Sequence, residues 1–233
     1  MRVEVSLAPA LYGCRTIKDN HVTVVIDVLR ATTAVCAAFQ AGCSEVRPVE
    51  DLSSLPQWRS QGYLLAAERG GKKVGDAEYG NSPTEYLKHD LTGVRLAYST
   101  TNGTRALLLA SDTCLTVAGC FANLSALAER LVREQKDVVV LCSGWEGDFC
   151  LEDTLVAGAL IERVAESPII HNDAAVMALN LWQVAKNDIA GFCEKASHVW
   201  RLRRLGADAD VRFALQMDTC PVVPVLKNEI LTL

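Results

Sequence analysis

Short apolar runs alternate with amphipathic stretches along most of the chain. The continuous runs predict buried strands, and stretches in which apolar residues recur every three or four positions predict helices. The predicted strands are Val22–Asp27, Glu45–Val49, Tyr63–Ala67, Val94–Ser99, Cys114–Ala118, Val138–Cys142 and Val222–Leu226. The predicted helices are Ala31–Gln40, Asp51–Gln61, Thr84–Lys88, Gly103–Ala110, Leu124–Glu134 and Leu151–Ala165, with a mostly helical segment after them to about Met217. Glu68–Pro83 has no apolar period and is predicted to be a long loop.

This alternation of strands and helices predicts an α/β fold. We expect a three-layer α/β/α arrangement, in which a largely parallel sheet is covered by helices on both faces. No linker rich in Pro, Gly or Ser divides the chain, so residues 1–233 are predicted to form a single unit. Two intertwined similar lobes remain an alternative, because three strands run into polar loops and then helices in the same way.

Composition narrows the class of protein. Half of the 233 residues are hydrophobic and 22% are charged, which excludes a disordered chain. The net charge of −5 disfavours binding to DNA or RNA. No apolar run is long enough to span a membrane, and we find no signal-peptide pattern at the start. We therefore expect a cytoplasmic protein whose nine cysteines are reduced and mostly buried.

Polar side chains gather in the loops that follow the predicted strands. In the first loop, Asp27 offers a hard oxygen for Mg²⁺, and Arg30 can bind phosphate or sulfonate with two N–H groups. Thr32 lies at the start of the next helix. An equally plausible interpretation is that Asp27 or Thr32 only caps that helix while Arg30 pairs with Asp27.

The second and third loops offer further groups for binding anions. Glu68 and Arg69 open the second loop, and Asn81-Ser82 closes it. Its 75–82 stretch nearly fits a nucleotide-binding P-loop, but Asn81 stands where the essential Lys belongs, so we exclude an NTPase. The third loop, residues 99–105, is rich in hydroxyl groups. Asn102-Gly103 permits a backbone turn that gathers N–H groups into an anion nest, and Arg105 follows.

The fourth loop leads into the predicted helix Leu151–Ala165, whose first turn holds Glu152 and Asp153. Acids there either complement the helix dipole or serve as a metal ligand or a general acid–base. Adjacent residues on a helix point about 100° apart, so only one of the two is expected to face a site. His21, His89, His171 and His198 show no HxH or HxxxH spacing, and no CxxC occurs, so the sequence predicts no zinc site. The oxygen-bearing groups favour Mg²⁺.

These motifs resemble the 2-phosphosulfolactate phosphatase (ComB) family, and the likeness spans nearly the whole chain in order. The segments that carry it are DVLRATT (27–33), AERGG (67–71), GNSP (80–83), STTNGTRA (99–106), LEDTLVAG (151–158) and DVRFALQMDTCPVVPV (210–225). The resemblance implies a Mg²⁺-dependent acid phosphatase, a single α/β unit that hydrolyses (R)-2-phospho-3-sulfolactate to 3-sulfolactate and phosphate. In methanogens that step belongs to coenzyme M synthesis.

The resemblance and the loops together give a site hypothesis. Asp27, Arg30 and Asp153 are expected to be catalytic, and Asp27 with Glu68 or Asp153 is expected to hold Mg²⁺. The residues expected to bind the small anionic substrate are Arg30, Thr32, Arg69, Asn81, Ser82, Thr100, Thr101, Asn102, Gly103 and Arg105.

Three alternatives stay open. They are a phosphatase for another 2-phospho-hydroxy acid, an isomerase or lyase acting on such acids, and a non-catalytic binding protein for anionic metabolites. We expect no nucleic-acid or membrane partner. A homodimer is left open as the oligomeric state, with the basic run Trp200–Leu205 interpreted as a solvated helix face or a subunit contact.

Overall fold

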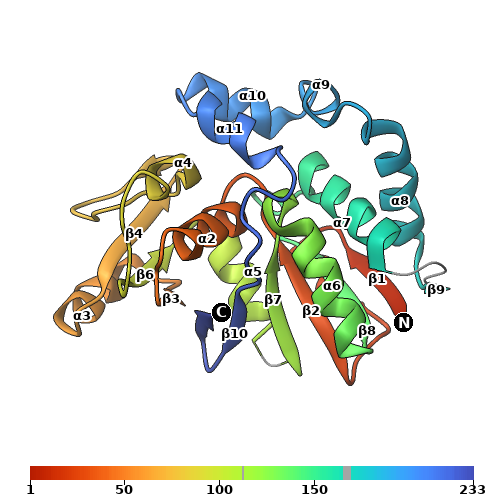
Figure 1. Cartoon of the computed structure of the whole chain (residues 1–233), viewed down its shortest axis with the longest axis horizontal. Helices are drawn as coiled ribbons and strands as arrows, with labels where there is room; N and C mark the ends of the chain where they lie inside the picture. The colour runs from red at the N-terminus through yellow and green to blue at the C-terminus, as the bar shows by residue number, and fades with distance from the viewer. Residues whose placement is uncertain (112, 165–168) are drawn as a thin grey trace.

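A mixed sheet forms the centre of the protein. The computed structural model describes residues 1–111, 113–164 and 169–233. Its strands are β1 (Arg2–Ser6), β2 (His21–Ile26), β3 (Glu45–Pro48), β4 (Leu64–Arg69), β5 (Lys72–Lys73), β6 (Arg95–Ser99), β7 (Leu115–Gly119), β8 (Asp137–Cys142), β9 (Ile169–Ile170), β10 (Val225–Lys227) and β11 (Ile230–Thr232). They pair in the order β5-β4-β6-β3-β11-β10-β7-β2-β8-β1-β9 (Figure 1).

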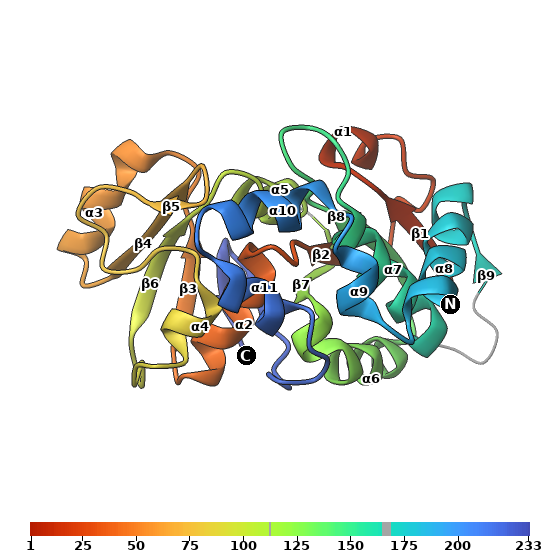
Figure 2. The same ribbon diagram turned by 90° about the horizontal axis from the view of Figure 1, so that it is seen from above.

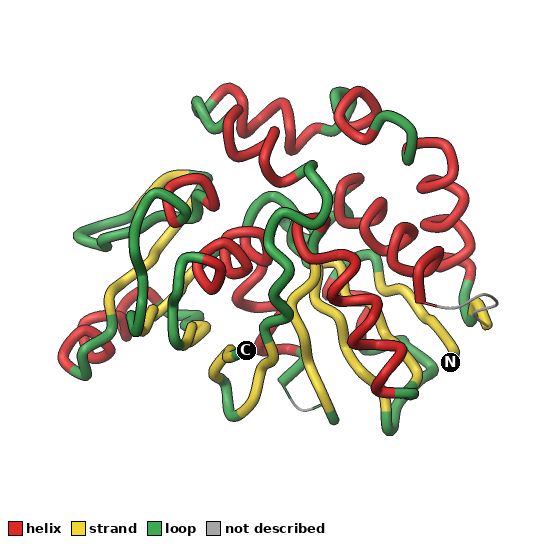
Figure 3. The backbone as a smooth tube through the Cα atoms, viewed as in Figure 1, coloured by secondary structure: helices red, strands yellow, loops and turns green. Residues whose placement is uncertain are grey.

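Helices cover this sheet and continue beyond the edge at which β2 ends. The α-helices are α1 (Pro9–Tyr12), α2 (Ala31–Gln40), α3 (Leu55–Ser60), α4 (Pro83–Tyr86), α5 (Gly103–Leu109), α6 (Leu124–Glu134), α7 (Leu151–Val164), α8 (Asp173–Ala185), α9 (Ile189–Cys193), α10 (Ser197–Arg204) and α11 (Asp208–Ala214). Two 3₁₀ turns, η1 (Leu52–Ser54) and η2 (Phe121–Asn123), precede α3 and α6. Figure 3 shows α8 to α11 as a nearly continuous series of helices. None of the described helices is both long and apolar enough to cross a membrane.

Two parallel sets of strands make up most of the sheet. β7, β2, β8 and β1 are parallel neighbours, and so are β4, β6 and β3. The antiparallel hairpin of β10 and β11 joins the two sets. The predicted α/β class, with a largely parallel sheet flanked by helices, is confirmed.

Strand β2 shows why this sequence builds such a sheet. All six of its residues are buried, as expected of a central parallel strand covered on both faces. Val24 belongs to the same core cluster as Leu127 of α6, whereas Val25 belongs to the cluster that contains Leu107 of α5. In the view from above, α6 and α5 accordingly lie on opposite sides of the strands (Figure 2).

Helix α2 lies between the two parallel sets, and its residues from Ala31 to Phe39 are all buried. Most of these side chains are small, which lets the helix pack closely on every side. The C-terminal helices α10 and α11 lie above α2 and above the carboxyl end of β2 in Figure 1, and in the view from above they lie in front of them (Figure 2). They therefore cover the edge at which the sequence places its polar loops.

Several predicted boundaries differ from the structure. The predicted helix Asp51–Gln61 divides into η1 and α3, because Pro56 fits only the first turn of a helix. Strand β10 begins at Val225 and not at Val222, since Pro224 cannot donate a ladder hydrogen bond. Helix α7 is described to Val164, so the predicted end at residue 165 lies outside the described residues.

Strand β1 was not predicted, because Glu4 interrupts its apolar run. The structure buries Glu4 and satisfies its carboxylate with the backbone N–H groups of Thr16 and Ile17. A charged residue can occupy an interior strand when such partners are present.

Candidate active site

A cavity opens above the carboxyl end of β2, beneath α10. The loops after β2, β4, β6 and β8 all contribute to it, together with α10 itself. Its lining residues are Asp27, Leu29, Arg30, Glu68, Gly70, Gly71, Asn81, Thr100, Thr101, Asn102, Trp145, Glu146, His198, Arg201 and Leu202. The structure thus brings together most of the residues predicted from the strand-end loops.

Asp27 lies at the base of this cavity and is 7% exposed. Its Oδ1 accepts the backbone N–H of Ala31 at 3.0 Å, at the N-terminus of α2. Burial raises the pKa of Asp27, and that donated hydrogen bond opposes the shift only in part. A buried carboxylate in this state gains from a nearby cation, because the cation replaces the water that the group has lost.

Thr32 has a structural role next to Asp27. Its hydroxyl lies 2.8 Å from the backbone oxygens of both Asp27 and Gly119, and the N–H of Asp27 donates to the same hydroxyl at 2.9 Å. Thr32 is fully buried and does not line the cavity. The structure therefore places it as a brace between β2, α2 and β7, and not at the predicted binding position.

Arg30 lines the cavity, and a buried carboxylate holds its guanidinium in place. Its Nη1 donates to Asp210 of α11 at 2.8 Å, and its Nη2 donates to the backbone oxygen of Gly71 at 2.9 Å. Asp210 also accepts from the hydroxyls of Ser82 and Thr84. Ser82 therefore supports the ion pair and caps α4. It was predicted to bind the substrate, but it does not line the cavity.

The second loop supplies Glu68, which is 6% exposed and accepts the backbone N–H of Gly71. Its neighbour Arg69 turns away from the cavity, and its guanidinium donates to the backbone oxygens of Glu68 and Glu50 and to Ser99 Oγ. Asn81 does line the cavity, and Tyr98 donates its hydroxyl hydrogen to the Asn81 side-chain oxygen.

The third loop lines the cavity with Thr100, Thr101 and Asn102. Thr101 Oγ1 is buried and has no hydrogen-bond partner among the described residues, which leaves it available to a ligand. Gly103 lets the third loop approach Ala31 and Asp27 closely, since a Cβ at this position would lie 2.3 Å from Ala31 Cβ and 2.7 Å from Asp27 Oδ2. Gly103 thus positions the loop without lining the cavity.

Arg105 lies outside the cavity. Its side chain is 70% exposed and forms a 3.5 Å ion pair with Glu50. Arg105 was predicted to supply a cation to the site, but Arg201 of α10 lines the cavity in its place. The Arg201 guanidinium carbon lies 4.7 Å from the centre of the Trp145 ring. The prediction that Trp200–Leu205 is only a solvated or subunit-contact face was therefore incomplete, because Arg201 and Leu202 line the cavity.

Asp153 lies behind the cavity and is 2% exposed. Its two oxygens accept backbone N–H groups, from Val28 at 2.9 Å and from Gly144 at 3.2 Å. Burial raises the pKa of Asp153 well above its usual range, and the carboxylate of Asp27 adds to the shift. These contacts join the loops after β2 and β8, so the geometry favours a positioning role for Asp153 over the predicted role as a metal ligand.

The donors in the cavity fit a magnesium ion. Asp27 and Glu68 are two buried carboxylates in one cavity, and their charges repel, which is one cause of the raised pKa of Asp27. A hard divalent cation that prefers oxygen ligands relieves that repulsion. Glu146 adds a third lining carboxylate, so the cavity combines three carboxylates with the guanidinium groups of Arg30 and Arg201.

Sequence reasoning missed the contributions of the C-terminal helices. His198, Arg201 and Asp210 lie far along the chain from the strand-end loops and form no local motif with them. Asp210 does begin one of the segments that carry the family resemblance, and that was the one signal that could have indicated a role for it.

Comparison with known proteins places the chain in a family. The sequence model of the 2-phosphosulpholactate phosphatase family matches residues 8–229. A protein of Microcystis aeruginosa described as a probable 2-phosphosulfolactate phosphatase is 37% identical over 98% of this chain and 97% of its own length. Proteins with the same description from Picosynechococcus sp. and Caldanaerobacter subterraneus are 39% identical (87% of this chain, 86% of theirs) and 34% identical (93% and 91%). The chain belongs to the 2-phosphosulpholactate phosphatase family.

Proposed function

We propose that the protein hydrolyses 2-phosphosulfolactate to 3-sulfolactate and inorganic phosphate. Family membership supports the reaction, and the composition of the cavity supports its site. The observation that carries the assignment is the meeting of Asp27 and Glu68 with Arg30 and the 100–102 loop in one cavity. Carboxylates alone would repel such a substrate, whereas cations alone would bind it without supplying a base or a metal ligand.

The cavity provides separate groups for the three anions of the substrate. Thr101 Oγ1 and the neighbouring loop donate toward one anionic group, and Arg30 and Arg201 supply charge from two other sides. Arg30 is already fixed by Asp210, so little side-chain entropy is lost when it binds. The guanidinium fork suits sulfonate, carboxylate and phosphate oxygens alike.

Asp27 and Glu68 would hold Mg²⁺ in this proposal. The ion would supply Lewis-acid polarisation of the phosphoryl group and would offset the charge that develops during transfer. Asp153 keeps the Val28 and Gly144 amides in place and so fixes the loop that carries Asp27. Arg30 remains beside the phosphoryl group as the second source of positive charge.

The reaction proceeds by in-line attack of water on phosphorus. The bond between phosphorus and the bridging oxygen breaks, and that oxygen takes up a proton from solvent to become the 2-hydroxyl of sulfolactate. A cavity carboxylate accepts the proton of the attacking water. Direct attack by Asp27 is the competing route. Rapid quenching distinguishes the two, since a trapped phospho-enzyme would refute water attack.

Phosphate release from a panel of 2-phospho-hydroxy acids, with Mg²⁺ and with EDTA, tests the proposal. We expect the sulfonated substrate to have the highest kcat/KM and expect EDTA to abolish turnover. Asp27→Asn should abolish activity, whereas Asp76→Asn, at a side chain 81% exposed, should retain it. A preference for an unsulfonated substrate would favour a different 2-phospho-hydroxy acid, and binding without phosphate release would favour a binding protein.

Two arginines provide a test of the cavity boundary. Arg30→Ala should lower kcat/KM by about 100-fold or more, since it removes a buried charge-assisted contact. Arg105→Ala should change kcat/KM less than about 5-fold, because its side chain is exposed and pairs with Glu50. Equal losses in both variants would show that Arg105 reaches the substrate.

A further inference from the structure

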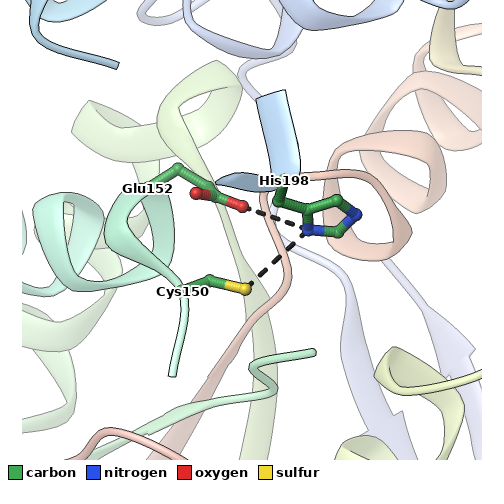
Figure 4. A group of neighbouring side chains, drawn as sticks. All are labelled: Cys150, Glu152 and His198. Atoms are coloured by element: carbon green, nitrogen blue, oxygen red, sulfur yellow. Dashed lines mark hydrogen bonds and ion pairs between the residues drawn. The ribbon is translucent and has the colours of Figure 1, made fainter. Parts of the chain in front are cut away.

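A second group of potential metal ligands lies beside the cavity. Cys150 immediately precedes α7, Glu152 is in the first turn of α7, and His198 is in the first turn of α10 (Figure 4). One ligand atom from each residue lies within 4.8 Å of the other two, and all three residues are buried. The group joins two helices whose starts are 46 residues or more apart in the sequence, so no local motif reveals it.

Glu152 is the feature that ordinary packing leaves unexplained. The residue is 1% exposed, and neither of its carboxylate oxygens has a hydrogen-bond partner within residues 1–111, 113–164 and 169–233. His198 Nδ1 lies 3.3 Å from Glu152 Oε1. A buried carboxylate without hydrogen bonds is costly, and a coordinated cation is one of the few ways to stabilise it.

The two separations from His198 are close to those of tetrahedral coordination. Zinc–sulfur bonds of about 2.3 Å and zinc–nitrogen or zinc–oxygen bonds of about 2.1 Å, at tetrahedral angles, separate sulfur from nitrogen by about 3.6 Å and nitrogen from oxygen by about 3.4 Å. The observed separations are 3.8 Å between Cys150 Sγ and His198 Nδ1 and 3.3 Å between His198 Nδ1 and Glu152 Oε1. The side chains are therefore close to a ligating arrangement.

We propose that Cys150, Glu152 and His198 form a binding site for a zinc-type divalent cation, separate from the magnesium site of Asp27 and Glu68. A thiolate and an imidazole select a borderline-soft ion, whereas the cavity carboxylates suit a hard one. Three protein ligands leave one coordination position for water, as in non-structural zinc sites.

Binding of the cation fixes the protonation of two ligands. The Cys150 thiol loses its proton to solvent, since only the thiolate ligates. Without a cation the thiol keeps that proton, because burial raises the pKa of Cys150. Ligation through Nδ1 requires the ring proton of His198 on Nε2, so Nε2 cannot accept a hydrogen bond from Arg201 Nη1, 3.4 Å away, in the bound state. The cation thus fastens α10 to α7.

Metal binding to the full-length protein tests the proposal without reference to phosphatase activity. The protein is stripped with a chelator, and Zn²⁺ is titrated in competition with a chromophoric chelator. We expect one tight equivalent per chain, with affinity at least about 100-fold lower in Cys150→Ser and in His198→Asn, a larger loss than removal of an outer-sphere partner causes. Cys36→Ala removes a buried thiol of another cluster and should leave the affinity unchanged.

Cobalt gives an independent signature of the thiolate. Co²⁺ should produce an intense near-ultraviolet sulfur-to-metal band in the parent protein, in Cys36→Ala and in Asp27→Asn, and no such band in Cys150→Ser. Zinc should also raise the Tm of the parent and leave that of Cys150→Ser unchanged. A cooperative melt of Cys150→Ser shows that this variant is folded and lacks only the site. Absence of tight zinc binding, or equal affinity in Cys36→Ala and Cys150→Ser, would overturn the proposal and identify Glu152 and His198 as a simple ion pair.

Discussion

The buried pair of Arg30 and Asp210 offers the sharpest test of how the cavity is built. Asp210 of α11 is 4% exposed and accepts hydrogen bonds from Arg30 Nη1 at 2.8 Å, Ser82 Oγ at 2.7 Å and Thr84 Oγ1 at 2.6 Å. It therefore connects α11 to the loop after β2 and to the start of α4. Asp210→Asn keeps the size of the side chain and removes its charge.

The expected loss of stability follows from the burial of both partners. Arg30 is 6% exposed, so water cannot solvate its charge when the carboxylate is removed. Removing one partner of a buried ion pair costs about 3–5 kcal/mol. For a chain of this length each kcal/mol lowers the Tm by about 2–4 °C. Asp210→Asn should thus lower the Tm by about 6–20 °C.

The same helix supplies a matched control. Asp208 also forms ion pairs, with Arg203 and Arg212, but its side chain is 36% exposed. Asp208→Asn should therefore cost less than about 1 kcal/mol. The free energy of unfolding is measured for both variants by urea titration and thermal melting.

A double-mutant cycle completes the test. Arg30→Met removes the cation, so the Asp210→Asn change should cost less in that background than in the parent. If Asp210→Asn and Asp208→Asn lose the same small amount, or if the two changes at the pair are additive, the burial argument is refuted.

Two further predictions concern packing and pH. Gly103→Ala should abolish activity and destabilise the fold by about 1–3 kcal/mol or more, since its Cβ would lie 2.3 Å from Ala31 Cβ. Gly13→Ala serves as the control, because the space around Gly13 is open. Both variants are compared with the parent in activity assays and thermal melts. Hydrogen bonds from Lys186, Trp182 and Gln183 lower the pKa of Glu162 from 4.5 to about 2. These contacts therefore stabilise the fold above pH 4.5, and the contribution is lost as the pH falls toward 2. Urea titrations at several pH values should show Glu162→Gln less stable than the parent by under about 1 kcal/mol at pH 7, with a difference that shrinks toward pH 2; a constant difference would contradict the linkage.

The sequence by itself determined the class of fold and the first group of cavity residues. Apolar runs such as that of β2, alternating with amphipathic stretches, indicated buried strands, and the polar residues after them were expected at the edge where the chain leaves the sheet. This reasoning identified Asp27, Glu68 and the 100–102 loop, because the local sequence indicates both where a strand lies and where it ends.

Side-chain direction was decided only by tertiary structure. Arg30 and Arg69 both follow strands, yet Arg30 faces the cavity because Asp210 and Gly71 hold it there, while Arg69 turns to Glu50 and Ser99. Those partners are distant in sequence, so spacing along the chain carries no information about them.

The assembly of the cavity also depended on tertiary structure. The two parallel sets of strands are joined by the antiparallel hairpin of β10 and β11. Neighbouring parallel strands end at one edge of a sheet, but Glu68 and Asp27 follow strands of different sets, so this rule does not predict that they lie close together. Packing around α2 and the covering helices α10 and α11 brings them together. His198 and Arg201 arrive from that cover, because long-range burial of apolar helix faces, and not any local motif, determines where α10 lies.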